Sequence, residues 1–300
     1  MNKLAIVIPY YKIDFFEETL KSIASQSDKH FTLYIGNDAS PNDPLPLIKQ
    51  YFEEEDYHYF DYKNNLGGQN LAMQWERILE NVSEEWFQIL GDDDMIADNF
   101  VEELNKSITK TNNGVVRVNR KVYNEDNILI REDFIDKDII DSVQLLSDGY
   151  QRKTVTSLSE FIFYKKKYDQ IKFTKIPLAW GTDVLAFLEF SDFKSITLIN
   201  TTNVLIKVTD KSITGNSTDL VQKKEEAFNI FRKILLEKYF SLLPNDIRNI
   251  LIKDYFSCCW KSKFYPEISL YKIYLKKGNL IEFLKKSITK YKVIKQIKSN

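Results

Sequence analysis

Cysteine, histidine and long apolar runs are scarce in this 300-residue chain. The two cysteines are adjacent, Cys258-Cys259, and the two histidines are His30 and His58, which excludes a disulfide framework and a Cys/His metal site. No segment reaches the length of about eighteen apolar residues that a membrane span needs, and Pro9 interrupts the N-terminal apolar stretch too early for a signal peptide. We therefore expect a cytoplasmic protein.

The charge is balanced, with a net value of −1, which excludes a chain that binds nucleic acid through its overall charge. Apolar residues make up 43% of the chain and aromatic residues 14%, enough for a packed core rather than a disordered segment. The length indicates either one large domain with an appendage or two domains.

Short apolar runs alternate with helical patterns over the first 120 residues. Strands are expected at 4–9, 31–35, 57–62, 86–90 and 115–118. Helices are expected to start near Asp14, to run up to about Glu55, and to follow Asn70 and Asp98. This alternation predicts an α/β fold with a Rossmann-like, mostly parallel sheet flanked by helices.

Polar and aromatic residues directly follow three of the expected strands. Pro9-Tyr10-Tyr11 ends the first, Asp38 follows the second, and Asp92-Asp93-Asp94 follows the fourth. The carboxyl ends of parallel strands meet at the edge where α/β proteins bind ligands. Because neighbouring carboxylates repel one another, the triplet is either a solvated acidic turn or the site of a cation. Its position on the shared edge favours the cation site.

The second half of the chain changes character. Shorter strand-like pieces occupy 121–215, where Trp180-Gly181-Thr182-Asp183 has the pattern of a helix N-terminus, and the remainder is helical. We therefore expect a domain over 1–215, with halves 1–120 and 121–215, and a helical region over 216–300. Its tail from Lys276 has eight lysines against one glutamate above an apolar stripe. This tail either solvates its lysines, associates with a partner or a second copy, or lies on an anionic membrane.

Four segments, in this order, resemble the inverting glycosyltransferases of family 2, which have the GT-A fold. They are LAIVIPYYK, IGNDASPND, LGDDDM and WGTD, and the likeness covers roughly residues 1–210. The chain departs from the family pattern at Asn37, Gly91 and Thr182, where the family usually has acidic residues. These departures affect the detailed geometry of the site more than the set of acidic residues that is kept.

The resemblance implies roles in the reaction for several residues. Asp93 is the first candidate ligand of Mn²⁺ or Mg²⁺, hard cations that prefer oxygen ligands. Asp94 is a possible second ligand or a surface carboxylate, and Asp92 faces the ribose or assists. Asp183 is the expected general base for the acceptor hydroxyl. Trp180 either stacks on an acceptor sugar or belongs to the core.

The same resemblance implies a nucleotide-binding set at the first three strand ends. Pro9 would border the base, with Tyr10 or Tyr11 against its ring unless both only pack at the strand end. Asp38 would accept a hydrogen bond from the base or hold the ribose. Gly67 either brings its bare backbone N–H to an anionic or sugar oxygen or only forms a tight turn.

The function implied is a metal-dependent, inverting transfer of a sugar from a nucleotide-diphosphosugar, expected to be a UDP-sugar, to a glycan or a lipid-linked acceptor. Such an activity is expected in the synthesis of surface polysaccharide, in the cytoplasm or at the inner face of the membrane. One alternative is a non-catalytic binding or scaffold protein of the same fold. A sugar nucleotidyltransferase is disfavoured because no glycine-rich loop follows the first strand.

Overall fold

The computed structural model describes residues 2–111, 113–209, 212–215, 218, 220–261, 271, 272, 275, 284 and 285. The chain divides into two compact units, Met1–Val221 and Gln222–Asn300, and each is described by itself. The predicted basic tail from Lys276 onward lies outside the described residues, apart from Leu284 and Lys285. Within the described ranges, no helix combines the length and the hydrophobicity that crossing a membrane requires.

A ten-stranded sheet, counted over the described residues, forms the centre of the first unit. The strands are β1 (Leu4–Tyr10), β2 (Phe31–Asp38), β3 (Tyr57–Tyr62), β4 (Trp86–Ile89), β5 (Met95–Ile96), β6 (Val115–Tyr123), β7 (Leu129–Asp133), β8 (Ile139–Asp141), β9 (Phe161–Tyr164) and β10 (Ser195–Lys207). Their order is β3-β2-β1-β4-β9-β6-β10-β5, with β7 beside β6 and β8 beside β10. Strands β1, β2, β3, β4, β6 and β10 share one direction, and the other four run against them. The predicted α/β fold is confirmed.

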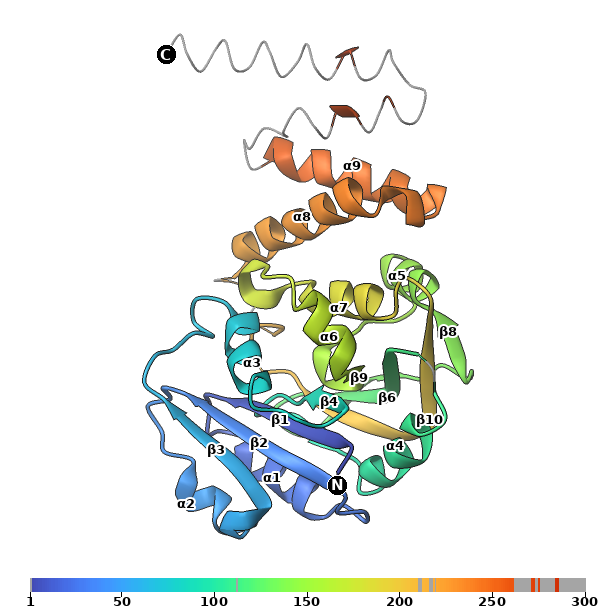
Figure 1. Ribbon diagram of the computed structural model, residues 1–300. Helices are drawn as coiled ribbons and strands as arrows, with labels where there is room; N and C mark the ends of the chain where they lie inside the picture. The colour runs from blue at the N-terminus through green and yellow to red at the C-terminus, as the bar shows by residue number, and fades with distance from the viewer. Residues whose placement is uncertain are drawn as a thin grey trace. The chain divides into compact units, whose positions relative to one another are not determined.

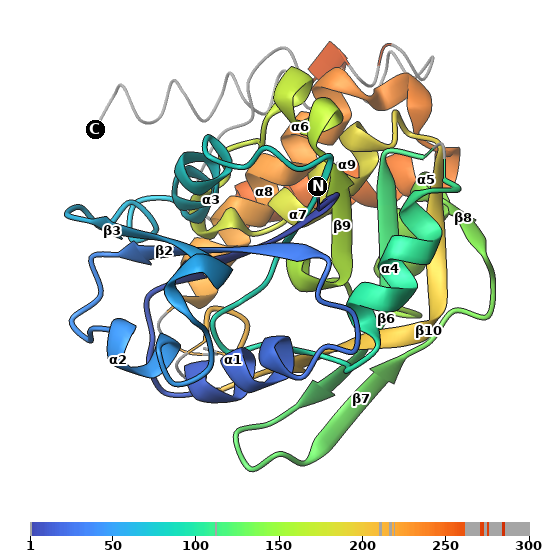
Figure 2. The ribbon, with the colours of Figure 1, turned by 60° about the horizontal axis from the view of Figure 1, so that its bottom comes forward.

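Helices cover both faces of this sheet (Figure 1, Figure 2). They are α1 (Phe16–Ala24), α2 (Leu45–Ile48), α3 (Leu71–Leu79), α4 (Phe100–Ile108), α5 (Ser142–Tyr150), α6 (Lys165–Ile171) and α7 (Thr182–Phe190), with the 3-10 turns η1 (Glu54–Asp56), η2 (Leu158–Glu160) and η3 (Pro177–Ala179). The remaining described elements are α8 (Val221–Lys238), η4 (Phe240–Leu242) and α9 (Asn245–Lys261). Helices α1 and α4 lie on one face of the sheet, and α3, α6 and α7 on the other.

The core forms on both faces because β1 is apolar throughout. Leu4, Ile6 and Ile8 pack with the buried faces of α1 and α4, as the uninterrupted apolar run predicts. Aromatic rings fill the space between the opposite face and α6 and α7. Phe87 packs against Phe163 with 5.7 Å between ring centroids, and further rings from β9, α6 and α7 surround them. Packed side chains therefore cover both faces of the sheet whose edge carries the candidate site.

Two expectations about helices are wrong in detail. The helix predicted up to Glu55 is the single turn α2, because Tyr51 and Phe52 pack against the core and the next residues form η1 instead. Asp98 does not cap α4, which begins after Asn99 without a side-chain cap. Asp98 instead accepts a hydrogen bond of 2.9 Å from the hydroxyl of Ser25.

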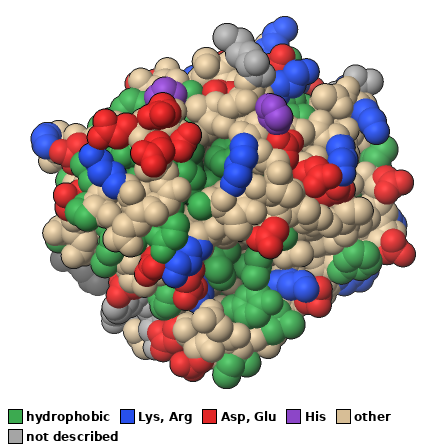
Figure 3. Space-filling model, turned by 90° about the horizontal axis from the view of Figure 1, so that it is seen from below, with side chains coloured by type: hydrophobic (Ala, Val, Ile, Leu, Met, Phe, Trp, Pro, Cys, Tyr) green, Lys and Arg blue, Asp and Glu red, His purple; other side chains and the backbone are tan. Residues whose placement is uncertain are grey.

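Both histidines are exposed, and histidine side chains are visible at the surface in Figure 3. The His30 Nδ1 lies 2.5 Å from an oxygen of Asp28, and the His58 ring stacks on Tyr34 at 4.8 Å.

An ion-pair network lies inside the second half of the sheet. The Arg117 Nε donates to Glu160 Oε1 over 2.7 Å, and both residues are almost completely buried. The Arg120 Nε donates to Asp133 over 2.9 Å and lies 3.4 Å from the other oxygen of Glu160. Buried charges are tolerated only where they are paired in this way, so removal of one partner leaves the others without compensation.

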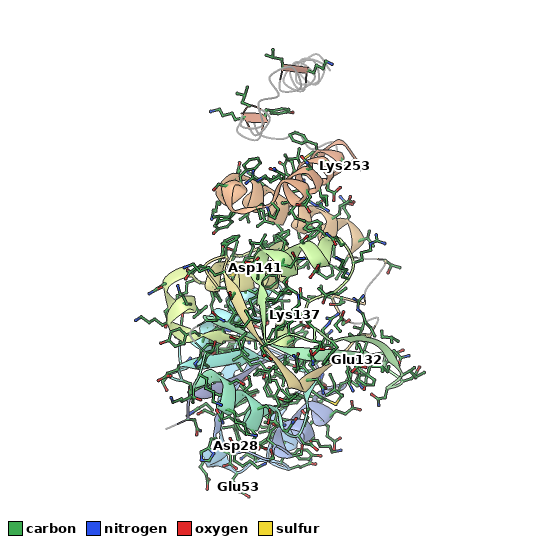
Figure 4. All side chains as sticks on the ribbon, turned by 90° about the vertical axis from the view of Figure 1, so that its right-hand side faces the viewer. Asp28, Glu53, Glu132, Lys137, Asp141 and Lys253 are labelled. Carbon is green, nitrogen blue, oxygen red and sulfur yellow. The ribbon has the colours of Figure 1, made fainter. Side chains whose placement is uncertain are left out.

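We predict that Glu160→Ala lowers the free energy of unfolding by about 3–5 kcal/mol, because it leaves the buried Arg117 guanidinium without its carboxylate and removes one of the two carboxylates beside Arg120. The matched control is Glu132→Ala on β7, which projects outward (Figure 4) and lies 3.5 Å from Lys121 Nζ. Removal of this surface pair should lower the free energy of unfolding by less than about 1 kcal/mol. Denaturant titration measures both values, and equal losses in the two variants would contradict the role of the buried network.

Candidate active site

The ends of β1, β2 and β4 meet at one edge of the sheet, as predicted from the alternation of strands and helices. The backbone N–H groups of Tyr11 and Lys12 both donate to Asp92 Oδ2 over 2.7 Å. The Ser40 hydroxyl, in the loop after β2, donates to the Tyr11 carbonyl over 2.6 Å. Asp92 therefore ties the loop after β4 to the loop after β1, which is tied in turn to the loop after β2.

Asp38 organises the loop that precedes α3. Its two oxygens accept from the N–H groups of Leu66, at 2.8 Å, and Gly67, at 2.7 Å. The guanidinium of Arg77 also pairs with Asp38 and lies 3.7 Å from the centre of the Tyr62 ring. A Cβ at Gly67 would lie 2.5 Å from Asp38 Oδ2, so glycine permits this close approach. The Gly67 N–H, for which a ligand contact and a tight turn were both open, is thus bound to Asp38.

Asp94 is buried, and protein donors satisfy both of its oxygens. The Ser159 hydroxyl donates to Oδ2 over 2.5 Å, and the Lys207 N–H donates to Oδ1 over 3.0 Å. The side chain of Lys207 is itself enclosed and donates to Glu18 over 2.7 Å. Asp94 therefore links the turn after β4 to η2 and to the end of β10.

Asp93 differs from both of its neighbours. Among the described residues, none other than Asp93 itself donates a hydrogen bond to its carboxylate. Burial and the charge of Asp94 raise the pKa of Asp93 to about 7, although Lys12 and Lys207 oppose the shift. Burial and Asp93 raise the pKa of Asp92 to about 7, and burial raises that of Asp94 to about 6. A cation beside Asp93 would relieve this repulsion.

The turn fits Mn²⁺ or Mg²⁺ through Asp93. Within the described ranges, no group of three or more His, Cys, Asp or Glu side chains is placed to hold a metal. Mg²⁺ is commonly held by one or two carboxylates together with substrate phosphates, which suits a single available aspartate. Gly91 leaves room for the turn, because a Cβ there would lie 2.9 Å from an oxygen of Asp94 and 3.0 Å from one of Asp93. An acidic side chain at position 91 would displace those carboxylates.

Asp183 lies in the first turn of α7, where the sequence predicts it. Gly181 directly precedes the helix with φ of 91°, a conformation that glycine adopts without strain. The Thr156 hydroxyl donates to Asp183 Oδ2 over 3.4 Å. Burial, with a contribution from the charge of Glu160, raises the pKa of Asp183 to about 6, although the Val184 N–H opposes it. Asp183 is therefore a weaker acid than an ordinary aspartate.

Trp180 is partly exposed beside a strained stretch of backbone. Leu178 and Ala179 have φ of 58° and 49°, which side chains other than glycine rarely adopt. Asn70 caps α3 and also donates to the Ile176 carbonyl over 3.0 Å, which holds this stretch against the first half of the sheet. Such strained residues occur often at functional sites, and both alternatives for Trp180, an acceptor contact or a place in the core, stay predictions.

The two tyrosines after β1 are placed differently. Tyr10 is buried, with its ring 4.6 Å from Phe16 and its hydroxyl donating to the Asn42 carbonyl over 3.1 Å. Tyr11 is 40% exposed, and Pro9 is partly exposed. Of the two predicted candidates, Tyr11 is therefore the one whose ring a ligand can reach.

Several site residues escaped sequence reasoning. Ser159 and Glu160 carry no recognisable motif, and Lys207 lies in an ordinary strand pattern. Asn37, where the family usually has an acidic residue, donates to Asp61 over 3.2 Å. A carboxylate at that position would face Asp61 with like charge. The sequence signal for this contact is the asparagine itself, at a position where the family usually has an acidic residue.

Comparison with known proteins matches these features to one family. A family model described as glycosyl transferase family 2 matches residues 5–190. Glycosyltransferase GlyA of Streptococcus pneumoniae serotype 4 (strain ATCC BAA-334 / TIGR4) is 23% identical over 181 residues, which are 60% of this chain. That match spans only 24% of GlyA.

Solved structures of TarS from S. aureus have the same fold. The structure of TarS 1–349 is 14% identical with a TM-score of 0.61, over 95% of this chain and 80% of that one. The structure of TarS 1–349 in complex with UDP-GlcNAc is 14% identical with a TM-score of 0.63. The match covers 86% of this chain and 73% of that one. The likeness establishes that the fold is shared.

We predict that Gly91→Ala perturbs the aspartate turn, because its Cβ would crowd the carboxylates of Asp93 and Asp94. The free energy of unfolding should fall by about 1–3 kcal/mol, as in other crowded sites, and stabilisation by added Mn²⁺ should shrink. Gly149→Ala in α5 is the control, because nothing lies within 4 Å of its Cβ position. Thermal unfolding with and without Mn²⁺ measures both effects. Matching curves for the two variants would show that Gly91 is not constrained.

Proposed function

This chain belongs to glycosyltransferase family 2, and from that premise we propose that it is a metal-dependent, inverting glycosyltransferase. It would move a sugar from a nucleotide-diphosphosugar, of the UDP class, to a hydroxyl of a glycan or a lipid-linked acceptor in the synthesis of surface polysaccharide. The observation that carries the proposal is Asp93, left without a donor from any other described residue between two anchored aspartates. A TarS structure of the same fold in complex with UDP-GlcNAc supports a UDP-sugar as donor.

On the donor side, the chain has to hold a diphosphate that leaves with growing negative charge. Aspartates alone would repel it. Asp93 would hold a divalent cation, which when bound would supply the compensating charge as a Lewis acid. Asp92 holds the loop of Tyr11 and Lys12 against the turn, so the exposed Tyr11 ring can lie along the base. Asp38 fixes the neighbouring loop and shapes the edge of the same site.

On the acceptor side, Asp183 would accept the proton of the attacking hydroxyl. A single displacement with one base inverts the configuration at the anomeric carbon, and it needs no second nucleophile from the protein. A pKa raised to about 6 makes Asp183 a stronger base than an ordinary aspartate while keeping it mostly ionised at pH 7. The partly exposed Trp180 is the residue that we assign to the acceptor sugar.

We predict that Asp183→Asn reduces transfer by about 10²–10⁴-fold, because an amide cannot accept the proton. UDP affinity should stay unchanged, since Asp183 makes no donor contact in this proposal. In the unsubstituted chain, kcat/KM should fall as the pH drops through about 6, because protonation removes the base. Steady-state rates against pH and UDP calorimetry measure these effects. A variant that turns over normally would remove Asp183 from the mechanism, and a wild-type chain that hydrolyses no nucleotide sugar would favour the scaffold alternative.

We predict that Asp93→Asn weakens UDP binding about tenfold or more in the presence of Mn²⁺, because the amide lacks the charge that holds the cation. Without metal, the variant should bind UDP at least as tightly as the wild-type chain, because one carboxylate that repels the diphosphate is gone. Asp136→Asn, an exposed aspartate after β7, is the charge-matched control and should behave as wild type. Calorimetry in both conditions gives the comparison, and an unchanged affinity with Mn²⁺ would assign the metal elsewhere.

A further inference from the structure

The segment Thr154–Glu160, between α5 and β9, connects the two halves of the candidate site. Its sequence is TVTSLSE, so four of its seven residues carry hydroxyl groups. Each of these four side chains makes a hydrogen bond to a charged residue of the unit. The segment is therefore neither a plain connector nor a solvated loop.

Ser159 meets the aspartate turn directly. Its hydroxyl donates to Asp94 Oδ2 over 2.5 Å and accepts from the Gly91 N–H over 3.2 Å. Its carbonyl accepts from the buried side chain of Gln88, at the end of β4, over 2.6 Å. One buried serine thus contacts the beginning of the turn, its last aspartate and the strand that leads into it.

The rest of the segment anchors Ser159 and reaches Asp183. Thr154 and Ser157 bond to the buried pair, with Arg117 donating to the Thr154 hydroxyl over 3.3 Å and Ser157 donating to Glu160 over 3.2 Å. Thr156, between them, donates instead to Asp183 over 3.4 Å. The same anchored segment therefore contacts a carboxylate of the donor side and the carboxylate of the acceptor side.

We infer that Ser159 is a positioning residue that acts through Asp94 to present Asp93 to the cation and the donor, and that Thr156 positions Asp183 for the acceptor. The inference rests on the proposed function. Without the Ser159 hydroxyl, one oxygen of a buried carboxylate would lose its donor, and buried groups left unsatisfied reorient or shift their surroundings. Asp94 adjoins Asp93 in the chain, so such a shift would reach the available carboxylate.

The test compares Ser159→Ala with Ser191→Ala, both buried serines that lose one hydroxyl. The Ser191 hydroxyl, directly after α7, donates to the Leu188 carbonyl of that helix over 3.1 Å. In the presence of Mn²⁺, Ser159→Ala should raise the Kd for UDP and the KM for the donor about tenfold, the loss typical of a hydrogen bond to a charged group. Ser191→Ala should leave both values unchanged. Ser159→Cys keeps the size of the side chain with a much weaker donor, and should shift both values in the same direction.

The second arm separates the two halves of the site. Thr156→Val should lower kcat about tenfold with the UDP Kd unchanged, and Thr156→Ser should restore kcat because it keeps the hydroxyl. If both residues had only a structural role, Ser159→Ala would not change the UDP Kd selectively, and Thr156→Val would not change kcat selectively. A wild-type chain that binds UDP while both Ser159 variants bind it equally well overturns the inference alone. A wild-type chain that binds no nucleotide overturns the proposed function, and the inference falls with it.

Discussion

Mutual repulsion among three consecutive carboxylates is the constraint on which this site depends. Burial raises the pKa of all three aspartates in the turn after β4, and in each case the charge of another aspartate raises it further. Asp92 takes two backbone N–H groups from the loop after β1, and Asp94 takes a hydroxyl from η2 and an N–H from β10. Asp93 accepts from none of the other described residues, and we propose that a cation binds there.

The partners that separate the aspartates also join distant parts of the chain. The bond from Ser159 to Asp94 spans 65 residues, and the bond from Lys207 spans 113. Because these partners belong to η2 and β10, the bonds to Asp94 join the second half of the unit's sequence to the turn in the first half. The buried pair of Arg117 and Glu160 bonds η2 to β6. In this view the ion-pair network serves the site by fixing the segment that contacts both Asp94 and Asp183.

Sequence patterns predicted the frame of the molecule but few of its internal partners. Strand alternation is a local signal, so β1 to β4 and the edge with Asp38 and Asp92 could be expected from spacing alone. The role expected for Asp183 came from the resemblance to the family. The helix predicted up to Glu55 is wrong because packing of Tyr51 and Phe52 against the core overrides the local pattern. Ser159 could not be expected, since a serine gains its role only from a carboxylate 65 residues away.

The most direct test of this account is the position of Mn²⁺ in a crystal of the chain grown with Mn²⁺ and UDP, located by its anomalous scattering. The account predicts the ion in direct contact with the Asp93 carboxylate and the diphosphate, while Asp92 still accepts from the N–H groups of Tyr11 and Lys12. An ion bound by Asp92 or Asp94 with Asp93 turned away, or a diphosphate bound without any ion, would contradict it.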